Sequence, residues 1–142
     1  MRSKSTKYII GIDEVGRGPL AGPVVVGGIK LKVKSSKLKV LHNIRDSKKL
    51  SAKQREEWFR VLINHPKIEW AVARVWPKII DRINITQAAN LGALRVCCKL
   101  SLPQSRVVLD GGLILSAHIP HKTVVKGDEK IPIVAAASII AK

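Results

Sequence analysis

The fold is decided by the stretch of residues 8–23, which reads YIIGIDEVGRGPLAGP. Its apolar first part predicts a buried strand at residues 8–13. Two acids, Asp13 and Glu14, stand where this strand ends, and a desolvated carboxylate must be paired, protonated or bound to a metal. The glycines that follow let a backbone approach a ligand closely, and Arg17 suits a phosphate. Acids for a metal beside an arginine for a phosphate indicate phosphodiester chemistry.

Strands and helices alternate along the rest of the chain. Apolar runs predict further strands at residues 23–31, 38–40, 68–76, 106–110 and 122–125. Helices are predicted at residues 51–64, 84–100 and 133–141. Ser51 with Gln54 forms a capping box, and Asn84 is an N-cap residue. This order predicts an α/β fold, with a mixed β-sheet flanked by helices.

The charge and composition of the chain indicate which partners it binds and in which cellular compartment it works. The 142 residues carry 26 Lys and Arg against 10 Asp and Glu, a net charge of +16, which favours nucleic acid as the partner. A basic protein from a salt-rich cell is the alternative. No run reaches the ~18 apolar residues of a membrane span and no signal peptide is recognisable, so we expect a cytoplasmic protein with no membrane partner. Cys97 and Cys98 are interpreted as small core residues of a reduced protein.

A third acid, Asp110, ends a predicted strand and precedes two glycines. Ligands of open α/β sheets bind at strand ends, so Asp13, Glu14 and Asp110 are candidates for one site. Because consecutive strand residues face opposite sides, Asp13 and Glu14 share a site only if the strand breaks there, which Gly16 permits. Carboxylate oxygens without a Cys or His cluster favour Mg²⁺ or Mn²⁺. The alternative is that each acid is a solvated strand end or turn residue.

Several basic residues are candidates for phosphate contacts. Lys48 and Lys49 lie in a predicted turn, and Lys126 follows the last predicted strand. Lysine clusters are more often solvated surface, which is the alternative for each of them. The glycine-rich segment at residues 16–22 superficially matches a dinucleotide-binding loop, but a strand follows it where that motif needs a helix. We therefore interpret this segment as a connection between strands.

Taken together, these residues resemble ribonuclease HII, the type 2 ribonuclease H family. The likeness is carried by ordered blocks at residues 11–23, 46–51, 81–88, 108–111, 126–128 and 135–139. The resemblance implies a ribonuclease H-like fold with its C-terminal part missing. It divides the chain into a basic N-terminal tail at residues 1–7 and an incomplete catalytic domain at residues 8–142.

The resemblance also implies an endoribonuclease, with links to DNA replication and ribonucleotide repair. Members of the family hydrolyse RNA within RNA–DNA hybrids and single ribonucleotides embedded in duplex DNA. They cut on the 5′ side of the ribonucleotide and use two Mg²⁺ or Mn²⁺ ions. Matched by position, Asp13, Glu14 and Asp110 are the metal-binding catalytic acids.

Gly16, Arg17 and Gly18 match the family loop that senses the 2′-hydroxyl, the group by which a protein distinguishes RNA from DNA. The chain departs from the family pattern in several places, among them Ile131 and Pro132, which replace more polar residues. Gly112 stands where an asparagine is usual, and the chain ends at Lys142, before the fourth catalytic aspartate that the family places after its last matched helix. We therefore expect a C-terminally truncated member of the family. We also expect a monomer.

Two alternatives to this enzyme stay open. A catalytically incomplete fragment of the same fold would bind nucleic acid without cutting it. Another nuclease of the same fold would act on DNA alone. Cleavage of a duplex with one ribonucleotide, compared with an all-DNA duplex, separates the three.

Overall fold

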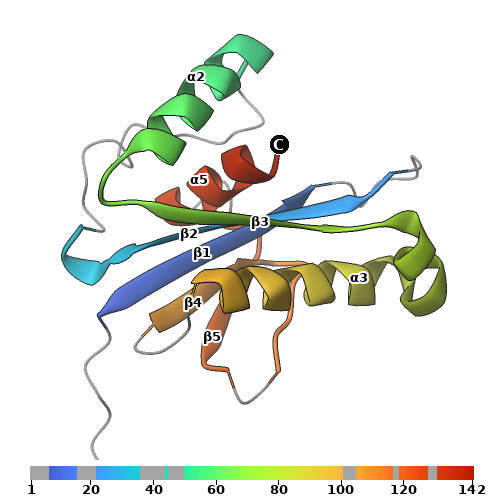
Figure 1. Ribbon diagram of the computed structural model, residues 1–142. Coiled ribbons are helices and arrows are strands. Elements are labelled where there is room, and N and C mark those ends of the chain that lie inside the picture. The colour runs from blue at the N-terminus through green and yellow to red at the C-terminus, as the bar shows by residue number, and fades with distance from the viewer. Residues whose placement is uncertain are drawn as a thin grey trace, which may run out of the picture.

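Three layers make up the structure, a computed structural model that describes residues 7–15, 22–35, 44, 50–100, 105–116, 119–127 and 131–142. A five-stranded sheet lies between helix α3 on one face and helices α5 and α2 on the other (Figure 1). The strands are β1 (Tyr8–Val15), β2 (Val24–Lys32), β3 (Glu69–Val75), β4 (Ser105–Asp110) and β5 (His121–Val124). The helices are α2 (Ala52–Asn64), α3 (Pro77–Leu100) and α5 (Pro132–Ala141), with a 3₁₀ turn η1 at Val33–Ser35. No helix among these described residues is long and apolar enough to cross a membrane.

The sheet is mixed and runs in the order β3-β2-β1-β4-β5. β2 pairs antiparallel with β1 and β3, whereas β4 pairs parallel with β1 and β5. These strands lie within two residues of their predicted bounds, and the strand expected at residues 38–40 falls outside the described residues. The predicted α/β fold with a mixed sheet is confirmed. Because β1 and β4 run parallel side by side, their carboxyl ends meet at one edge of the sheet.

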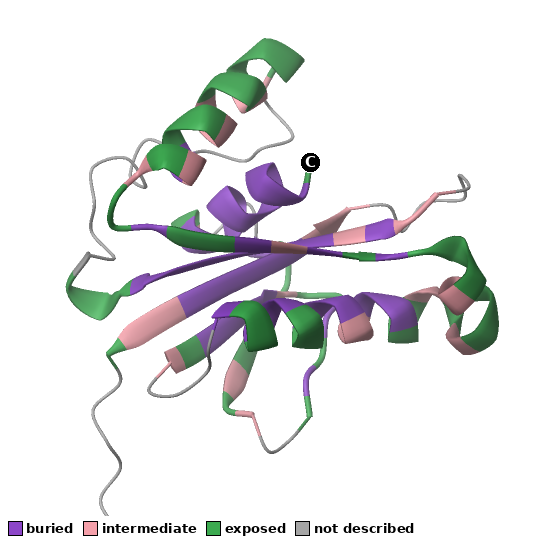
Figure 2. Cartoon of the chain, in the orientation of Figure 1, coloured by how far each residue is buried: buried purple, intermediate pink, exposed green. Residues whose placement is uncertain are grey.

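The central strands consist mostly of buried residues (Figure 2), and two clusters of buried apolar residues pack against the sheet. Ile10 and Ile12 of β1 belong to the cluster that packs against Val96 of α3. Ile29 of β2 belongs to the opposite cluster, which includes Ile139 of α5. The central strands are therefore buried on both sides, as expected for a sheet with parallel pairs.

Helix α3 begins earlier than the sequence predicts. The expected start is Asn84, but α3 begins at Pro77, and Asn84 has a non-helical φ of 71° and ψ of 168°. The element is thus two helices joined at a kink. Asn84 Oδ1 accepts a hydrogen bond from the Gln87 backbone N at 3.0 Å, which confirms Asn84 as the N-cap of the second helix. The first helix was missed because a proline suits the first turn of a helix as well as the end of a strand.

The capping box predicted at the start of α2 is present. Ser51 Oγ accepts a hydrogen bond from the Gln54 backbone N at 3.1 Å, and Gln54 Oε1 accepts one from the Ser51 backbone N at 2.9 Å. These two bonds satisfy donors that the start of a helix leaves unpaired. Because α2 packs against α5, the box also stabilises the layer that covers α5.

The two cysteines differ in burial, which corrects the interpretation of both as core residues. Cys97 is buried in the cluster between α3 and the sheet, whereas Cys98 is exposed. Neighbouring helical residues point about 100° apart, so only one of the pair faces the sheet. Burial raises the pKa of the Cys97 thiol to about 12, and the adjacent Cys98 adds to the rise.

We expect iodoacetamide to alkylate Cys98 in the folded protein and Cys97 only after unfolding. The thiolate is the reactive form, and the raised pKa keeps Cys97 protonated at about pH 8, near the usual pKa of a thiol. Mass spectrometry of peptides from native and urea-unfolded protein measures the labelling of each residue. Rapid labelling of Cys97 in the native protein would contradict its burial.

Two glycines let α5 lie close to the sheet. A Cβ atom at Gly11 would lie 2.8 Å from the backbone O of Ile133. A Cβ atom at Gly27 would lie 2.7 Å from both the backbone O of Ala137 and the backbone N of Ala141. All three obstacles are backbone atoms, which cannot rotate away. The first turn of α5 therefore has a closely defined position over β1, and its later turns have one over β2.

We expect Gly27→Ala to lower the free energy of unfolding by about 1–3 kcal/mol, because the added methyl group overpacks against the backbone of α5. Urea unfolding followed by circular dichroism measures the change. Lys53→Ala, at an exposed position of α2, is the control and should shift the free energy by less than about 0.5 kcal/mol. Equal stability of the two variants would show that α5 lies farther from β2.

Candidate active site

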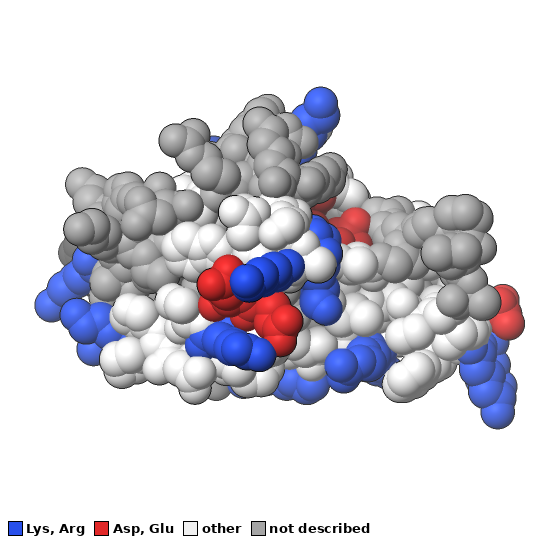
Figure 3. Space-filling view, turned by 90° about the horizontal axis from the view of Figure 1, so that it is seen from above, with Lys and Arg blue, Asp and Glu red and all other residues white. Residues whose placement is uncertain are grey.

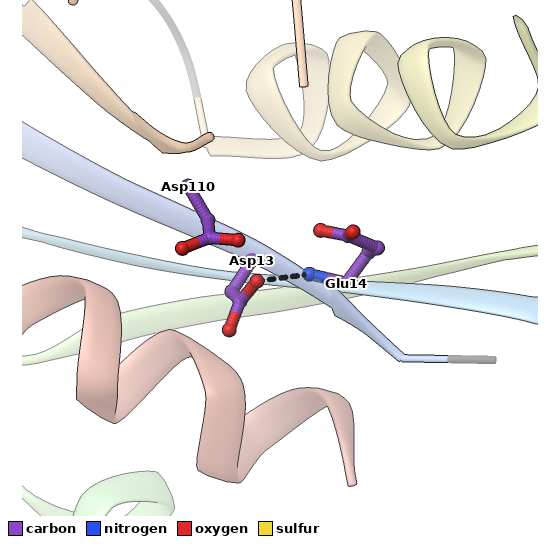
Figure 4. A group of neighbouring side chains, drawn as sticks. All are labelled: Asp13, Glu14 and Asp110. Carbon is purple, nitrogen blue, oxygen red and sulfur yellow. Dashed lines mark hydrogen bonds between the residues drawn. The ribbon is translucent and has the colours of Figure 1, made fainter. Parts of the chain in front are cut away.

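Three carboxylates meet at the edge where β1 and β4 end (Figure 4). Asp13 and Glu14 belong to β1, and Asp110 is the last residue of β4. One carboxylate oxygen from each lies within 4.8 Å of the others. The strand register explains this, because Ile12 pairs with Leu109 and the next residue on each strand is an acid. The predicted convergence of the three acids is confirmed.

Glu14 joins the group without the strand break that the sequence led us to expect. β1 continues to Val15, which pairs with Val25 of β2. Within the described residues, the ladder between β1 and β4 ends at Ile12. The Glu14 backbone N donates a hydrogen bond to Asp13 Oδ1 at 2.8 Å, so the Asp13 carboxylate lies along the strand toward Glu14. The two neighbours share a site because β1 extends past the end of β4.

The acids line an open cleft with a volume of about 490 Å³. Asp13 is only 4% exposed, and Glu14 and Asp110 are partly buried. Lys126 and Lys142 line the same cleft, and Figure 3 shows basic side chains beside the acidic group. Carboxylates crowded together destabilise one another in their charged form unless cations lie nearby. The two lysines supply part of that positive charge.

The chemistry of the acidic group fits a divalent metal ion. In the part of the chain that the structure describes, Asp13, Glu14 and Asp110 form the group of acid, Cys or His side chains close enough to share one ion. Hard carboxylate oxygens without sulfur or imidazole ligands favour Mg²⁺ or Mn²⁺. Mg²⁺ retains several waters and often binds substrate phosphates as well as one or two carboxylates. An open cleft accommodates such ligands, whereas a closed cage would not.

Two further residues of the cleft, Ser138 and Lys142, were not selected from the sequence. Ser138 is buried in α5, and Lys142 caps the end of that helix. Their spacing of four residues places them on one face of the helix. That spacing becomes informative only once α5 is known to cross the sheet beside the acids.

The basic candidates have different outcomes. Lys126 lines the cleft, in the turn after β5, with a φ of 55°. The other candidates lie outside the described residues and stay predictions: Gly16, Arg17, Gly18, Lys48 and Lys49.

Comparison with protein families and curated proteins gives a consistent result. The family model described as ribonuclease HII matches residues 10–142. A ribonuclease HII of Coxiella burnetii is 38% identical over 141 residues, which cover 99% of this chain and 67% of that protein. A ribonuclease HII of Chlorobaculum parvum is 42% identical over 135 residues, which cover 94% of this chain and 65% of that protein. The chain thus spans about two thirds of the length of these relatives.

Solved structures agree with these relatives. The ribonuclease HII in a complex with PCNA from Archaeoglobus fulgidus has a TM-score of 0.73 and 28% identity, covering 94% of this chain and 70% of that one. The ribonuclease H2 of Pyrococcus horikoshii OT3 has a TM-score of 0.70 and 32% identity with the same coverage. A Bst-RNase HIII in complex with Mn²⁺ has a TM-score of 0.71 at 21% identity and covers 96% of this chain and 51% of that one, a likeness of fold. The predicted ribonuclease H-like fold is confirmed.

We expect Asp13→Asn to abolish the stabilisation of the protein by Mn²⁺ while leaving the fold intact. The substitution removes one of the three negative charges that could hold the ion and also relieves repulsion within the acidic group. Thermal unfolding with and without Mn²⁺ measures the effect, since an ion at 100 times its Kd stabilises by about 2.7 kcal/mol. Glu57→Gln, an exposed acid of α2, is the matched control and should respond to Mn²⁺ like the wild type. Unfolding of Asp13→Asn would instead assign Asp13 a structural role.

Proposed function

Because the chain belongs to the ribonuclease HII family, whose members are endoribonucleases of RNA–DNA hybrids, we propose that it cuts on the 5′ side of ribonucleotides. The substrates are RNA–DNA hybrids and duplex DNA with embedded ribonucleotides. The observation that carries the proposal is the convergence of Asp13, Glu14 and Asp110 at one end of the sheet. The net charge of +16 supports a nucleic-acid substrate.

In the proposed reaction a water molecule attacks the phosphorus atom and the 3′ oxygen of the preceding nucleotide leaves. The products carry a 3′-hydroxyl and a 5′-phosphate. Asp13, Glu14 and Asp110 would hold two Mg²⁺ or Mn²⁺ ions, which would supply activation of the water and stabilisation of the leaving oxygen. The hydrogen bond from the Glu14 backbone to Asp13 orients one carboxylate before any ligand binds. No side chain need act as a nucleophile.

Recognition of the ribonucleotide is assigned to the loop after β1. In the sequence, Gly16, Arg17 and Gly18 come one residue after Glu14, with Val15, the last residue of β1, between them. Contacts to the 2′-hydroxyl would distinguish a ribonucleotide from a deoxyribonucleotide. Lys48, Lys49 and Lys126 are proposed to contact phosphates of the duplex, which would position it without reading its sequence.

The setting of the activity is part of the same proposal. We place the protein in the cytoplasm as a monomer that acts during DNA replication and ribonucleotide repair. The second candidate function is binding of nucleic acid without turnover, which the same basic charge supports equally well. Cleavage, and not binding, therefore distinguishes the two candidates.

We expect the wild type with Mn²⁺ to cut a DNA duplex that carries one ribonucleotide, on the 5′ side of that residue. Denaturing electrophoresis of an end-labelled duplex shows the position of the cut. Asp13→Asn should be inactive and Glu57→Gln fully active. Salt-sensitive binding without cleavage would support the second candidate. Equal cleavage of an all-DNA duplex would exclude the ribonucleotide proposal.

We expect Arg17→Ala to reduce the preference for a ribonucleotide junction more than it reduces binding to duplex DNA. The reason is that Arg17 belongs to the loop assigned to the 2′-hydroxyl. The preference is the ratio of kcat/KM for a duplex with one ribonucleotide to kcat/KM for a continuous RNA–DNA hybrid, and fluorescence anisotropy measures binding to duplex DNA. Arg95→Ala, at an exposed position of α3, controls for loss of one positive charge. An unchanged ratio in Arg17→Ala would count against the loop assignment.

A further inference from the structure

Two side chains of the cleft have no part in the proposed function, although both lie beside the acids. Ser138 is 1% exposed, and its Oγ accepts a hydrogen bond from Lys142 Nζ at 3.0 Å. Both residues line the cleft together with Asp13 and Asp110. A buried hydroxyl thus holds the ammonium group of an otherwise flexible lysine at the edge of the acidic group.

The backbone of α5 defines where this pair lies. The Lys142 backbone N donates to the Ser138 backbone O at 3.2 Å, so the helical geometry continues through both residues. The close contacts of α5 with Gly27 involve Ala137 and Ala141, which directly precede Ser138 and Lys142. A close approach of α5 to the sheet therefore lies next to the pair. The position of Ser138 relative to β1 is set by backbone packing and not by a mobile loop.

The charges that line the cleft indicate a role for Lys142. Three carboxylates line the cleft, and a phosphodiester carries a negative charge that they repel. Lysine binds phosphate as a compact point charge, but its flexible stem loses rotamer freedom when the ammonium is held in one place. The hydrogen bond to Ser138 restricts the stem before the substrate arrives. An ammonium group has three donors, so one can serve Ser138 while others serve oxygens in the cleft.

A simpler role is that Lys142 only balances the charge of the acids. Charge balance requires only that a cation lies near the acids. It does not explain why the buried hydroxyl of Ser138 restricts the side chain of Lys142. We propose that Lys142, positioned by Ser138, binds a non-bridging oxygen of the phosphodiester that is cut. The inference rests on the proposed function, because it names a contact to the substrate of that reaction. Lys142 is the residue that touches the substrate, and Ser138 is a positioning residue.

A thermodynamic cycle tests the contact without turnover. One duplex carries a single ribonucleotide with a normal phosphodiester at the cleavage position, and the other carries an uncharged methylphosphonate there. Binding is measured by fluorescence anisotropy in Ca²⁺, under conditions in which no cutting is seen. We expect Lys142→Ala to bind the normal duplex about tenfold more weakly and the methylphosphonate duplex as well as the wild type does.

The salt dependence of duplex binding, measured for Lys142→Ala and Ser138→Ala, distinguishes a residue that contacts the phosphate from one that positions the contacting residue. Loss of one phosphate contact should reduce the slope of log K against log salt by about 1 in Lys142→Ala. Ser138→Ala should weaken binding by about threefold with an unchanged slope, because the charge remains but is less well held. Lys53→Ala removes an equal charge at an exposed site of α2 and should affect both duplexes equally and weakly. Thermal unfolding of each variant confirms that it is folded.

Two results would overturn the inference. One is an equal loss of affinity for both duplexes in Lys142→Ala, which would show no coupling to that phosphate. The other is tighter Mn²⁺ binding by Lys142→Ala with unchanged affinity for the normal duplex, which would make Lys142 a counter-ion of the acids. A different result would contradict the proposed function itself: the wild type would cut all-DNA duplexes as well as ribonucleotide duplexes, or would cut neither. The binding cycle would still measure the contact of Lys142 in that case.

Discussion

The parallel pairing of β1 with β4 is the constraint on which the site depends. Its register places Ile12 opposite Leu109, so that the acids that follow them emerge at the same edge of the sheet. Charge repulsion between the three carboxylates favours separation of the strand ends that carry them. Hydrophobic packing on both faces of the sheet keeps these strands together. The acidic group is therefore a local cost that the buried strands offset. Such a cost is typical of a site that is completed by cations.

A second constraint is the contact of α5 with the sheet. Gly11 and Gly27 remove the Cβ atoms that would hold the helix away, and the helix then delivers Ser138 and Lys142 to the acidic cleft. One helix thus has two roles, since its apolar residues cover the core and its last turn supplies polar groups to the site. Packing and function are coupled here, because a shift of α5 would move Ser138 relative to the acids.

The two signs of charge in the cleft have complementary roles in the proposed chemistry. Asp13, Glu14 and Asp110 attract divalent cations, whereas Lys126 and Lys142 attract a phosphate. Neither set alone suits hydrolysis of a phosphodiester, because acids repel the substrate and lysines cannot hold the metal ions. Membership of the ribonuclease HII family agrees with this combination, and the excess positive charge of the chain extends it to binding of a long polyanion.

Local features were readable from the sequence because they depend on neighbouring residues. Apolar runs predicted the strands, Ser51 and Asn84 identified two N-caps, and the ordered motifs selected the three acids. Tertiary structure decided what depends on contacts between distant segments. It showed that Glu14 shares the site without a strand break and that Ser138 and Lys142 lie beside it. A local sequence pattern does not specify which two strands end next to each other. Strand register and the distance between helix and sheet arise from packing between segments that are distant in the sequence.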